Sequence, residues 1–90
     1  MLSFEWDPEK AKKNHKKHGV NFEEASTVFY DALSATFDDH DHSIGEHRLI
    51  TVGFSSIGRL LVVSHTDRGK TIRIISARPA TARERTKHEN

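Results

Sequence analysis

Four arginines lie close together in the last quarter of the chain, where an apolar stretch gives way to a polar one. Arg73 lies within the apolar stretch 72–77, Arg78 follows it, and Arg83 and Arg85 come a few residues later. The guanidinium group suits phosphate well, because it presents paired N–H donors in one plane. Four of these groups within thirteen residues indicate a phosphate-binding site, and nucleic acid is the first ligand to consider.

The segment around Pro79 predicts how these arginines are brought together. Proline suits the first position of a helix, which would place Arg78 beside the positive end of the helix dipole. A cation is unfavourable there unless an anion lies between, and helix N-termini are themselves phosphate sites. With Arg68 expected in the preceding turn, we predict that Arg68, Arg73, Arg78 and Arg83 converge on one concave phosphate pocket.

The charges are unevenly distributed along the chain. Residues 21–47 contain seven acidic residues and no lysine or arginine, whereas residues 48–87 contain nine lysines and arginines and two acidic residues. This separation predicts an acidic patch and a basic patch on one small body. The alternative is that the two halves neutralise each other, and that Glu84 and its neighbours pair with the arginines in surface ion pairs worth about 0–1 kcal/mol each.

Histidines add a candidate base and a weaker candidate metal site. His88 is four residues after Glu84, so the two share a helix face. A histidine near several arginines tends to be neutral and can then accept a proton. His40, Asp41 and His42 are zinc or hard-cation ligands in type, but they match no fixed ligand spacing. A solvated acidic loop is the preferred interpretation of that segment.

Size and composition predict a single small domain spanning residues 1–90. The chain has no cysteine, so it has neither a disulfide framework nor a thiolate zinc site. We expect a cytoplasmic protein that does not enter the membrane, because the N-terminus lacks the features of a signal peptide. In addition, no apolar run approaches the roughly 18 residues that a membrane span requires.

Local signals predict two helices in the first third of the chain. Asp7 is a suitable N-cap, and the proline after it suits the first helical position. The resulting helix should cover residues 8–18 and end at Gly19. It is so rich in lysine that hydrophobic burial alone is not expected to hold it. Asn21 is expected to cap a second helix, whose apolar residues include Phe22 and belong to the core.

The remaining pattern predicts strands and a final helix. A short extended segment precedes the first helix, and the later strands are expected at 35–37, 48–54, 59–66 and 71–77. Short glycine-containing turns join the last three, which indicates an antiparallel meander. With a C-terminal helix after Pro79, the predicted fold class is α+β with the order β-α-α-β-β-β-β-α.

Taken in order along the chain, these features resemble the BrnT toxin family, relatives of the RelE-like ribonucleases of bacterial type II toxin–antitoxin modules. Single matching pieces are weak signals, but their order and spacing hold over nearly the whole chain. The matching residues are Phe4 to Pro8, Lys10, Ala11 and Asn14, Lys17 to Val20, Phe22 to Ala25, Val28, Phe29, Gly45, Glu46, Arg48, Arg68, Gly69, Arg73 to Arg78, Ala80, Thr81, Glu84 and Arg85.

The resemblance implies a RelE-like fold, with two N-terminal helices and one C-terminal helix packed on a twisted, mainly antiparallel sheet. It also implies an endoribonuclease that inhibits translation and needs no metal or cofactor, because the 2′-hydroxyl of RNA serves as the nucleophile. The expected partner is a BrnA-like ribbon-helix-helix antitoxin, in a 2:2 complex that binds operator DNA through the antitoxin. The alternative is a non-catalytic module that only binds nucleic acid or the antitoxin.

Site residues are carried over from the family by position. The expected catalytic residues are Arg68, Arg78, Arg83 and His88, and the expected RNA-binding residues are Arg73, Arg85, Lys17 and His18. One departure concerns His88, because many members of the family have a tyrosine there. A histidine at this position can serve as the base or as a stacking group, or it can mark a weakened enzyme.

Overall fold

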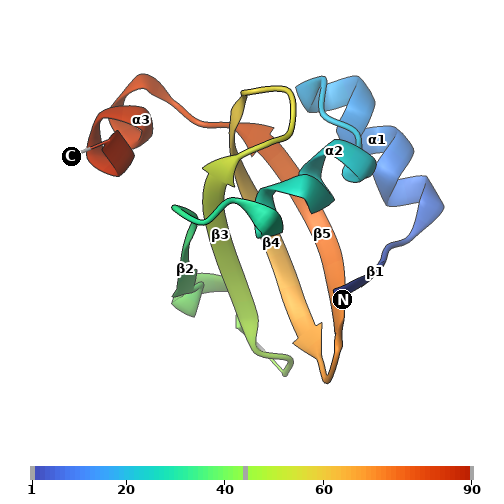
Figure 1. Ribbon diagram of the computed structural model, residues 1–90. Coiled ribbons are helices and arrows are strands. Elements are labelled where there is room, and N and C mark those ends of the chain that lie inside the picture. The colour runs from blue at the N-terminus through green and yellow to red at the C-terminus, as the bar shows by residue number, and fades with distance from the viewer. Residues whose placement is uncertain (1, 44, 90) are drawn as a thin grey trace.

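The computed structural model of the protein describes residues 2–43 and 45–89. A five-stranded sheet with the strand order β1-β5-β4-β3-β2 forms its centre (Figure 1). Its elements are β1 (Ser3–Glu5), α1 (Pro8–His18), α2 (Phe22–Thr27), β2 (Ala35–Asp38), β3 (Arg48–Phe54), β4 (Leu60–Arg68), β5 (Thr71–Pro79) and α3 (Ala82–Glu89). All strand pairs are antiparallel except β1 with β5. The predicted α+β class is therefore confirmed.

Two short 3-10 turns add to the elements expected from the sequence. One, Val28–Tyr30, continues directly from α2, and the other, His40–His42, follows β2. Among the residues that the structure describes, no helix is both long and apolar enough to cross a lipid bilayer.

Helix α1 has the predicted ends and an unusual attachment to the sheet. Asp7 accepts a hydrogen bond from the Glu9 N–H at 2.8 Å, and Gly19 ends the helix with a left-handed φ of 70°. The buried amide of Asn14 donates to the carbonyls of Val20 (2.9 Å) and Ala77 (2.8 Å), and it accepts the Ala77 N–H (3.0 Å). These bonds fasten a lysine-rich helix to β5 where its apolar surface is too small to do so alone.

The main hydrophobic core lies between the sheet and the helices α1 and α2. Asn21 caps α2 as predicted, accepting the Glu24 N–H at 2.7 Å. Successive strand residues point to opposite faces of a sheet, so alternate positions of β4 reach this core. In β5 a register shift opposite Ser64 and His65 moves the core-facing positions from Ile74 to Ala77. The buried members of the core are Val20, Phe22, Ala25, Val28, Leu61, Val63, Ile72, Ile74 and Ala77.

The opposite face of the sheet carries a smaller cluster of Val52, Leu60 and Val62. Helix α3 packs over one end of this face, where Ala80 contacts the cluster and His88 meets Phe54. Figure 1 shows α3 standing beside the upper part of the sheet and well away from α1. Much of this second face therefore remains accessible.

Two boundaries near the arginines differ from the prediction. Strand β4 continues to Arg68, so Arg68 ends a strand rather than lying in the turn. Strand β5 continues to Pro79, which pairs with Leu61 instead of starting a helix. Helix α3 begins later, at Ala82, and Thr81 caps its start. Thr81 Oγ1 accepts the Glu84 N–H at 3.2 Å, and the Glu84 carboxylate accepts the Thr81 N–H at 2.9 Å.

Candidate active site

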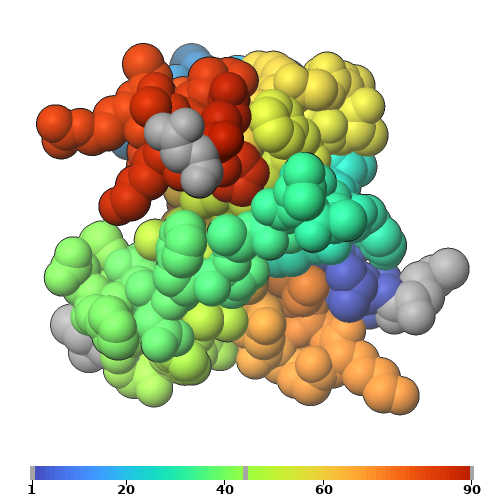
Figure 2. Space-filling model, turned by 60° about the vertical axis from the view of Figure 1, so that its left-hand side comes forward, coloured from blue at the N-terminus to red at the C-terminus, as the bar shows by residue number. Residues whose placement is uncertain are grey.

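A groove of about 760 Å³ lies between α3 and β2, on the sheet face opposite α1 and α2. In Figure 2 it is the hollow between the red C-terminal helix and the green segment that contains β2. One wall is apolar and comes from the β2 region, the floor is apolar, and the other wall is charged. The apolar wall consists of Leu33, Ala35 and Phe37, and the floor consists of Ile50, Val52 and Val62. The charged wall consists of Arg78, Glu84, Lys87 and His88, and Asp38 also lines the groove.

Arg78 occupies the charged wall in a fixed orientation. It pairs with Val62 across β5 and β4, so its side chain emerges on the groove face. Its Nη1 and Nη2 donate to the two carboxylate oxygens of Glu84 at 2.8 and 2.9 Å, and Nη1 also donates to the Pro79 carbonyl at 3.3 Å. A guanidinium has five N–H donors, so donors remain for a ligand.

The Arg78–Glu84 pair also fixes the charge states of both groups. The hydrogen-bonded guanidinium lowers the pKa of Glu84 to about 2. The same hydrogen bonds raise the pKa of Arg78. Both residues therefore stay charged throughout the physiological pH range, and Arg78 presents a permanent positive charge to the groove.

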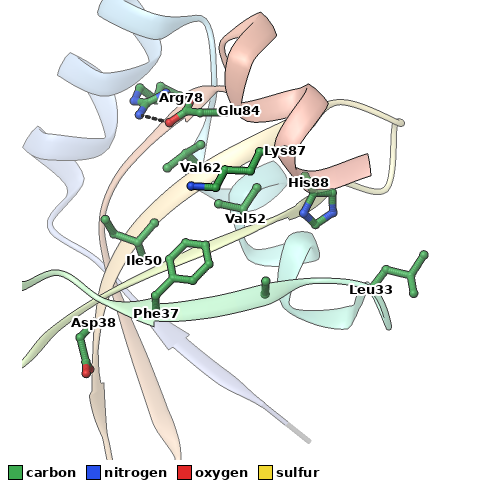
Figure 3. Close-up of a pocket in the computed structure, with 11 residues that line it drawn as sticks. Leu33, Phe37, Asp38, Ile50, Val52, Val62, Arg78, Glu84, Lys87 and His88 are labelled. Carbon is green, nitrogen blue, oxygen red and sulfur yellow. Dashed lines mark hydrogen bonds and ion pairs between the residues drawn. The ribbon is translucent and has the colours of Figure 1, made fainter. Parts of the chain in front are cut away.

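Lys87 and His88 add a cation and an imidazole to the same wall. The His88 ring lies edge-on against Phe54, with 6.0 Å between ring centroids. Figure 3 shows the Lys87 side chain reaching into the space between Arg78 and Phe37. Arg78 and His88 are among the site residues expected from the sequence, whereas Lys87 and Phe37 are not. The groove therefore brings the Arg78–Glu84 ion pair, a lysine and an imidazole together above an apolar floor.

The predicted convergence of four arginines on one pocket is wrong. Arg73 and Arg78 are both on β5, five residues apart, which corresponds to about 16 Å along a strand. Arg68 lies at the same end of the sheet as Arg73, since it pairs with Thr71. Both are removed from the groove because β5 runs as one strand from Thr71 to Pro79, and its register shift opposite Ser64 and His65 does not bring the two ends together.

Acidic partners hold the arginines at that distant end. Arg68 donates from Nε and Nη2 to the Glu46 carboxylate at 2.9 and 3.3 Å. Arg73 lies 3.6 Å from a carboxylate oxygen of Glu5. Glu46 also has its pKa lowered, chiefly by the hydrogen bond from Arg68. The alternative that carboxylates pair with these arginines therefore describes this end of the sheet.

Arg83 and Arg85 lie on exposed positions of α3 and do not line the groove. Arg85 lies 3.5 Å from Glu89. Lys17 and His18 are in a different place again: they line a shallow hollow of about 210 Å³ between α1 and β5, next to Ile75. The expected RNA-binding residues thus occupy several surfaces rather than one.

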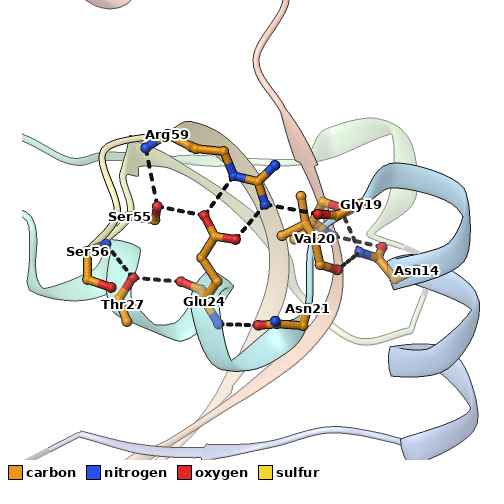
Figure 4. Close-up of polar contacts among 10 residues, drawn as sticks. Asn14, Gly19, Val20, Asn21, Glu24, Thr27, Ser55, Ser56 and Arg59 are labelled. Atoms are coloured by element: carbon orange, nitrogen blue, oxygen red, sulfur yellow. Dashed lines mark hydrogen bonds and ion pairs between the residues drawn. The ribbon is translucent and has the colours of Figure 1, made fainter.

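A further ion pair, between Arg59 and Glu24, joins the basic and acidic parts of the sequence. Arg59 donates from Nε to Glu24 at 2.9 Å, and its Nη2 donates to the Gly19 carbonyl at 2.9 Å (Figure 4). Ser55 donates to the same Glu24 carboxylate at 2.7 Å. This network ties α2 to the turn between β3 and β4. An acidic residue of segment 21–47 is therefore paired with a basic residue of segment 48–87 within the fold.

The histidine-rich segment after β2 is held by its own carboxylates. His42 Nδ1 lies 3.0 Å from Asp39, and His47 Nε2 lies 2.6 Å from Asp38 Oδ1. Within residues 2–43 and 45–89, no group of three or more His, Asp or Glu side chains is placed to hold a metal ion. Part of the segment forms the 3-10 turn His40–His42, and Asp39 at its start is buried.

Comparison with known proteins identifies the family. A family model described as the ribonuclease toxin BrnT of type II toxin–antitoxin systems matches residues 6–84. Among curated proteins, none matches the chain. The 1.1 Å crystal structure of the Brucella abortus ribonuclease toxin BrnT has a similar fold, with a TM-score of 0.68 and 21% sequence identity over 90% of this chain and 99% of that one. Since the family model spans most of the chain, the protein belongs to the BrnT family of ribonuclease toxins.

Proposed function

We propose that this chain is a metal-independent endoribonuclease toxin and that it cleaves RNA in the groove between α3 and β2. The observation that carries the proposal is the meeting of Arg78, Lys87 and His88 on one wall of that groove. Two cations and an imidazole are suited to the cleavage of a phosphodiester. The family description, a ribonuclease toxin, supports this assignment.

In the proposed reaction the RNA supplies its own nucleophile. His88 accepts the proton of the 2′-hydroxyl, and the 2′ oxygen forms a bond to phosphorus as the bond to the 5′ oxygen breaks. The 5′ oxygen takes a proton from water, which leaves a 2′,3′-cyclic phosphate and a 5′-hydroxyl end. Arg78 and Lys87 stabilise the charge that develops on the phosphate oxygens. The groove contributes further by aligning the reacting atoms.

Glu84 acts in this scheme as a positioning residue. Its two hydrogen bonds to Arg78 hold the guanidinium plane, so that the remaining donors keep one direction. A group held in place before the reaction stabilises transition-state charge without having to reorganise. Arg83 and Arg85, exposed on the same helix, extend the positive charge beside the groove.

The arginines at the other end of the sheet have a different role in the proposal. Arg68 and Arg73 are too distant to contact the phosphate held by Arg78, so they bind phosphates of the flanking RNA. Lys17 and His18 provide a further contact for a longer RNA. This division replaces the single phosphate pocket expected from the sequence.

The proposed partner is a BrnA-like ribbon-helix-helix antitoxin, which neutralises the toxin in a 2:2 complex and binds operator DNA. Without the antitoxin, cleavage of RNA in the cytoplasm inhibits translation. The support for this part is the family's description as one half of a type II toxin–antitoxin system.

The test is cleavage of a labelled RNA by the purified protein in excess EDTA. We expect cleavage to persist, to yield 2′,3′-cyclic phosphate ends and to be lost in Arg78→Ala. Lys70→Ala is the matched control, because it removes an exposed cation from the turn between β4 and β5 and should cleave normally. Cleavage that needs an added divalent metal, or that survives in Arg78→Ala, would contradict the proposal. RNA binding without cleavage would support the alternative of a non-catalytic module.

The role of His88 has its own test within the same assay. His88→Gln keeps a polar side chain at this position but removes the imidazole that accepts the 2′-hydroxyl proton, so the cleavage rate should fall by about 10²–10⁴-fold. A variant that cleaves at the wild-type rate would remove His88 from the role of base.

A further inference from the structure

The exposed aromatic ring of Phe37 has no role in the fold that accounts for its position. Phe37 is 52% exposed, on the edge strand β2, and it is absent from both hydrophobic clusters. Burial of a phenylalanine is worth about 1.5–3 kcal/mol, and much of that is not realised here. An aromatic ring left open inside a groove is more informative than one on a flat surface.

We propose that Phe37 stacks against an unpaired RNA base next to the cleaved phosphate. The inference rests on the proposed function, and it adds a base-binding residue to a site otherwise defined by its charges. Bases of single-stranded RNA commonly stack on aromatic side chains, and such stacking is tolerant of sequence because every base has a π-face.

The register of β2 and β3 places the ring over the apolar floor. Phe37 is directly opposite Ile50, and Ala35 is opposite Val52. Side chains at paired positions lie on the same face, so the Phe37 ring stands beside Ile50 and faces the groove. Figure 3 shows the ring between Ile50 and the space into which Lys87 extends. A flat ligand lying on Phe37 therefore has apolar contacts beneath it and cations across from it.

The distribution of charge in the groove favours a nucleotide over an apolar peptide. A nucleotide has a flat, largely apolar base joined to an anionic phosphate. The groove has an apolar side formed by Phe37 and Leu33, and a side with the cations Arg78 and Lys87, where Glu84 pairs with Arg78. An apolar side chain from a protein partner would fill the floor, but it would leave the remaining donors of Arg78 and the Lys87 ammonium without an anionic ligand.

The experiment uses a short single-stranded RNA with 2-aminopurine at the nucleotide to be tested. A 2′-deoxy substitution at the reacting sugar prevents cleavage, so binding is measured by itself. Stacking on an aromatic ring is expected to quench the 2-aminopurine fluorescence when the wild-type protein binds. In Phe37→Ala the quench should be lost and the affinity should fall by about tenfold.

Two further variants separate stacking from a structural effect. Phe37→Trp keeps an aromatic face and should restore both quenching and affinity. Ile57→Ala removes an exposed apolar side chain (70% exposed) in the turn between β3 and β4, and it should bind like the wild type. Thermal unfolding of all variants checks that the fold is intact, which is expected because Phe37 lies outside both clusters.

The outcomes distinguish this inference from the proposed function. Unchanged quenching and affinity in Phe37→Ala would overturn the stacking role, even if the wild type cleaves RNA. Quenching that depends on Phe37 in a protein that never cleaves RNA would support base binding and contradict the nuclease. If Phe37→Ala loses binding of the purified antitoxin but keeps RNA binding and quenching, the ring serves a protein partner and the inference is wrong.

Discussion

The carboxylate of Glu84 joins two functions, because it accepts hydrogen bonds from both Arg78 and the backbone of Thr81. Two bonds come from the Arg78 guanidinium at 2.8 and 2.9 Å, and one comes from the Thr81 N–H at 2.9 Å. Thr81 and Glu84 thus form a capping box at the start of α3. The position of the helix and the direction of the guanidinium are therefore set by the same side chain.

Glu84→Gln should destabilise the protein and weaken cleavage at the same time. Loss of the charged cap and of the ion pair should lower the free energy of unfolding by about 1 kcal/mol, with the ion pair contributing modestly because it is partly exposed. For a domain of this size that corresponds to roughly 4–8 °C in Tm. The value of kcat should fall, because Arg78 is no longer held in one orientation.

Glu89→Gln is the control for this prediction. Glu89 lies on the same helix and faces Arg85 at 3.5 Å, but both side chains are about half exposed. Its substitution should change stability by less than about 0.5 kcal/mol. Equal effects of the two variants on Tm and kcat would contradict the special role of Glu84.

Acid titration provides a separate prediction for Glu84. Its pKa is about 2 in the folded protein, compared with an ordinary value of 4.5, so the unfolded chain takes up the proton first. The contribution of the carboxylate to stability is complete above about pH 4.5 and is lost as the pH falls towards 2. The difference in unfolding free energy between wild type and Glu84→Gln should therefore shrink across this range. A difference that stays constant from pH 6 to pH 2.5 would contradict the charged pairing.

Buried His65 should make the fold sensitive to mild acid. It is 1% exposed, and its ring nitrogens lie 2.9 Å from Asp67 and 2.8 Å from Thr51 Oγ1. Burial lowers its pKa below the ordinary 6.5, while Asp67 opposes that shift. Because the unfolded chain then binds the proton more readily, this contribution to stability is complete above about pH 6.5 and falls as the pH is lowered through the folded-state pKa.

The measurement is the free energy of unfolding from pH 8 to pH 5, obtained by urea denaturation. His65→Gln should be less stable than the wild type at pH 8 but should show a flatter pH dependence. His15→Gln, at an exposed position of α1, should keep the wild-type dependence. If the slope is the same in all three proteins, His65 is not its source.

Features set by neighbouring residues could be predicted from the sequence. The start of α1 at Asp7 and its end at Gly19 depend on local hydrogen bonds and on a left-handed φ, and both were predicted correctly. The strand 48–54 was also predicted with its observed bounds, because its alternating residues and flanking turns are local signals. Local chemistry was therefore a sufficient guide in these places.

The arrangement of the site depended on contacts that local signals do not reveal. Pro79 looked like a helix start, but its pairing with Leu61 keeps it in β5. Arg68 looked available for phosphate, but its partner Glu46 is 22 residues away. Phe37 looked like an ordinary strand residue, and only the tertiary structure shows that it is half exposed beside the groove.

Asn14 should be among the most sensitive positions of the fold. Its amide satisfies the buried carbonyls of Val20 and Ala77 and the buried N–H of Ala77. Asn14→Leu keeps a similar volume but leaves these backbone groups without partners, so we expect a loss of about 3 kcal/mol in unfolding free energy. Lys16→Leu, at an exposed position of the same helix, should change stability by less than about 0.5 kcal/mol. If Asn14→Leu lowers the unfolding free energy no more than Lys16→Leu does, the amide network does not stabilise the fold as proposed.

The separation of Arg73 and Arg78 predicts that the two residues act on different phosphates. With a dinucleotide as substrate, Arg78→Gln should abolish cleavage and Arg73→Gln should have no effect, since about 16 Å of β5 separates the two positions. With an RNA of about twenty nucleotides, Arg73→Gln should also weaken kcat/KM. The slope of log K for RNA binding against log salt concentration should become shallower by about 0.7 in Arg73→Gln, the value for one phosphate contact on a single strand.

The ion pair of Arg73 with Glu5 is long, at 3.6 Å, and partly exposed, so its loss should leave Tm nearly unchanged. If Arg73→Gln abolishes cleavage of the dinucleotide as completely as Arg78→Gln does, both arginines contact one phosphate, and the assignment of Arg73 to flanking RNA is wrong.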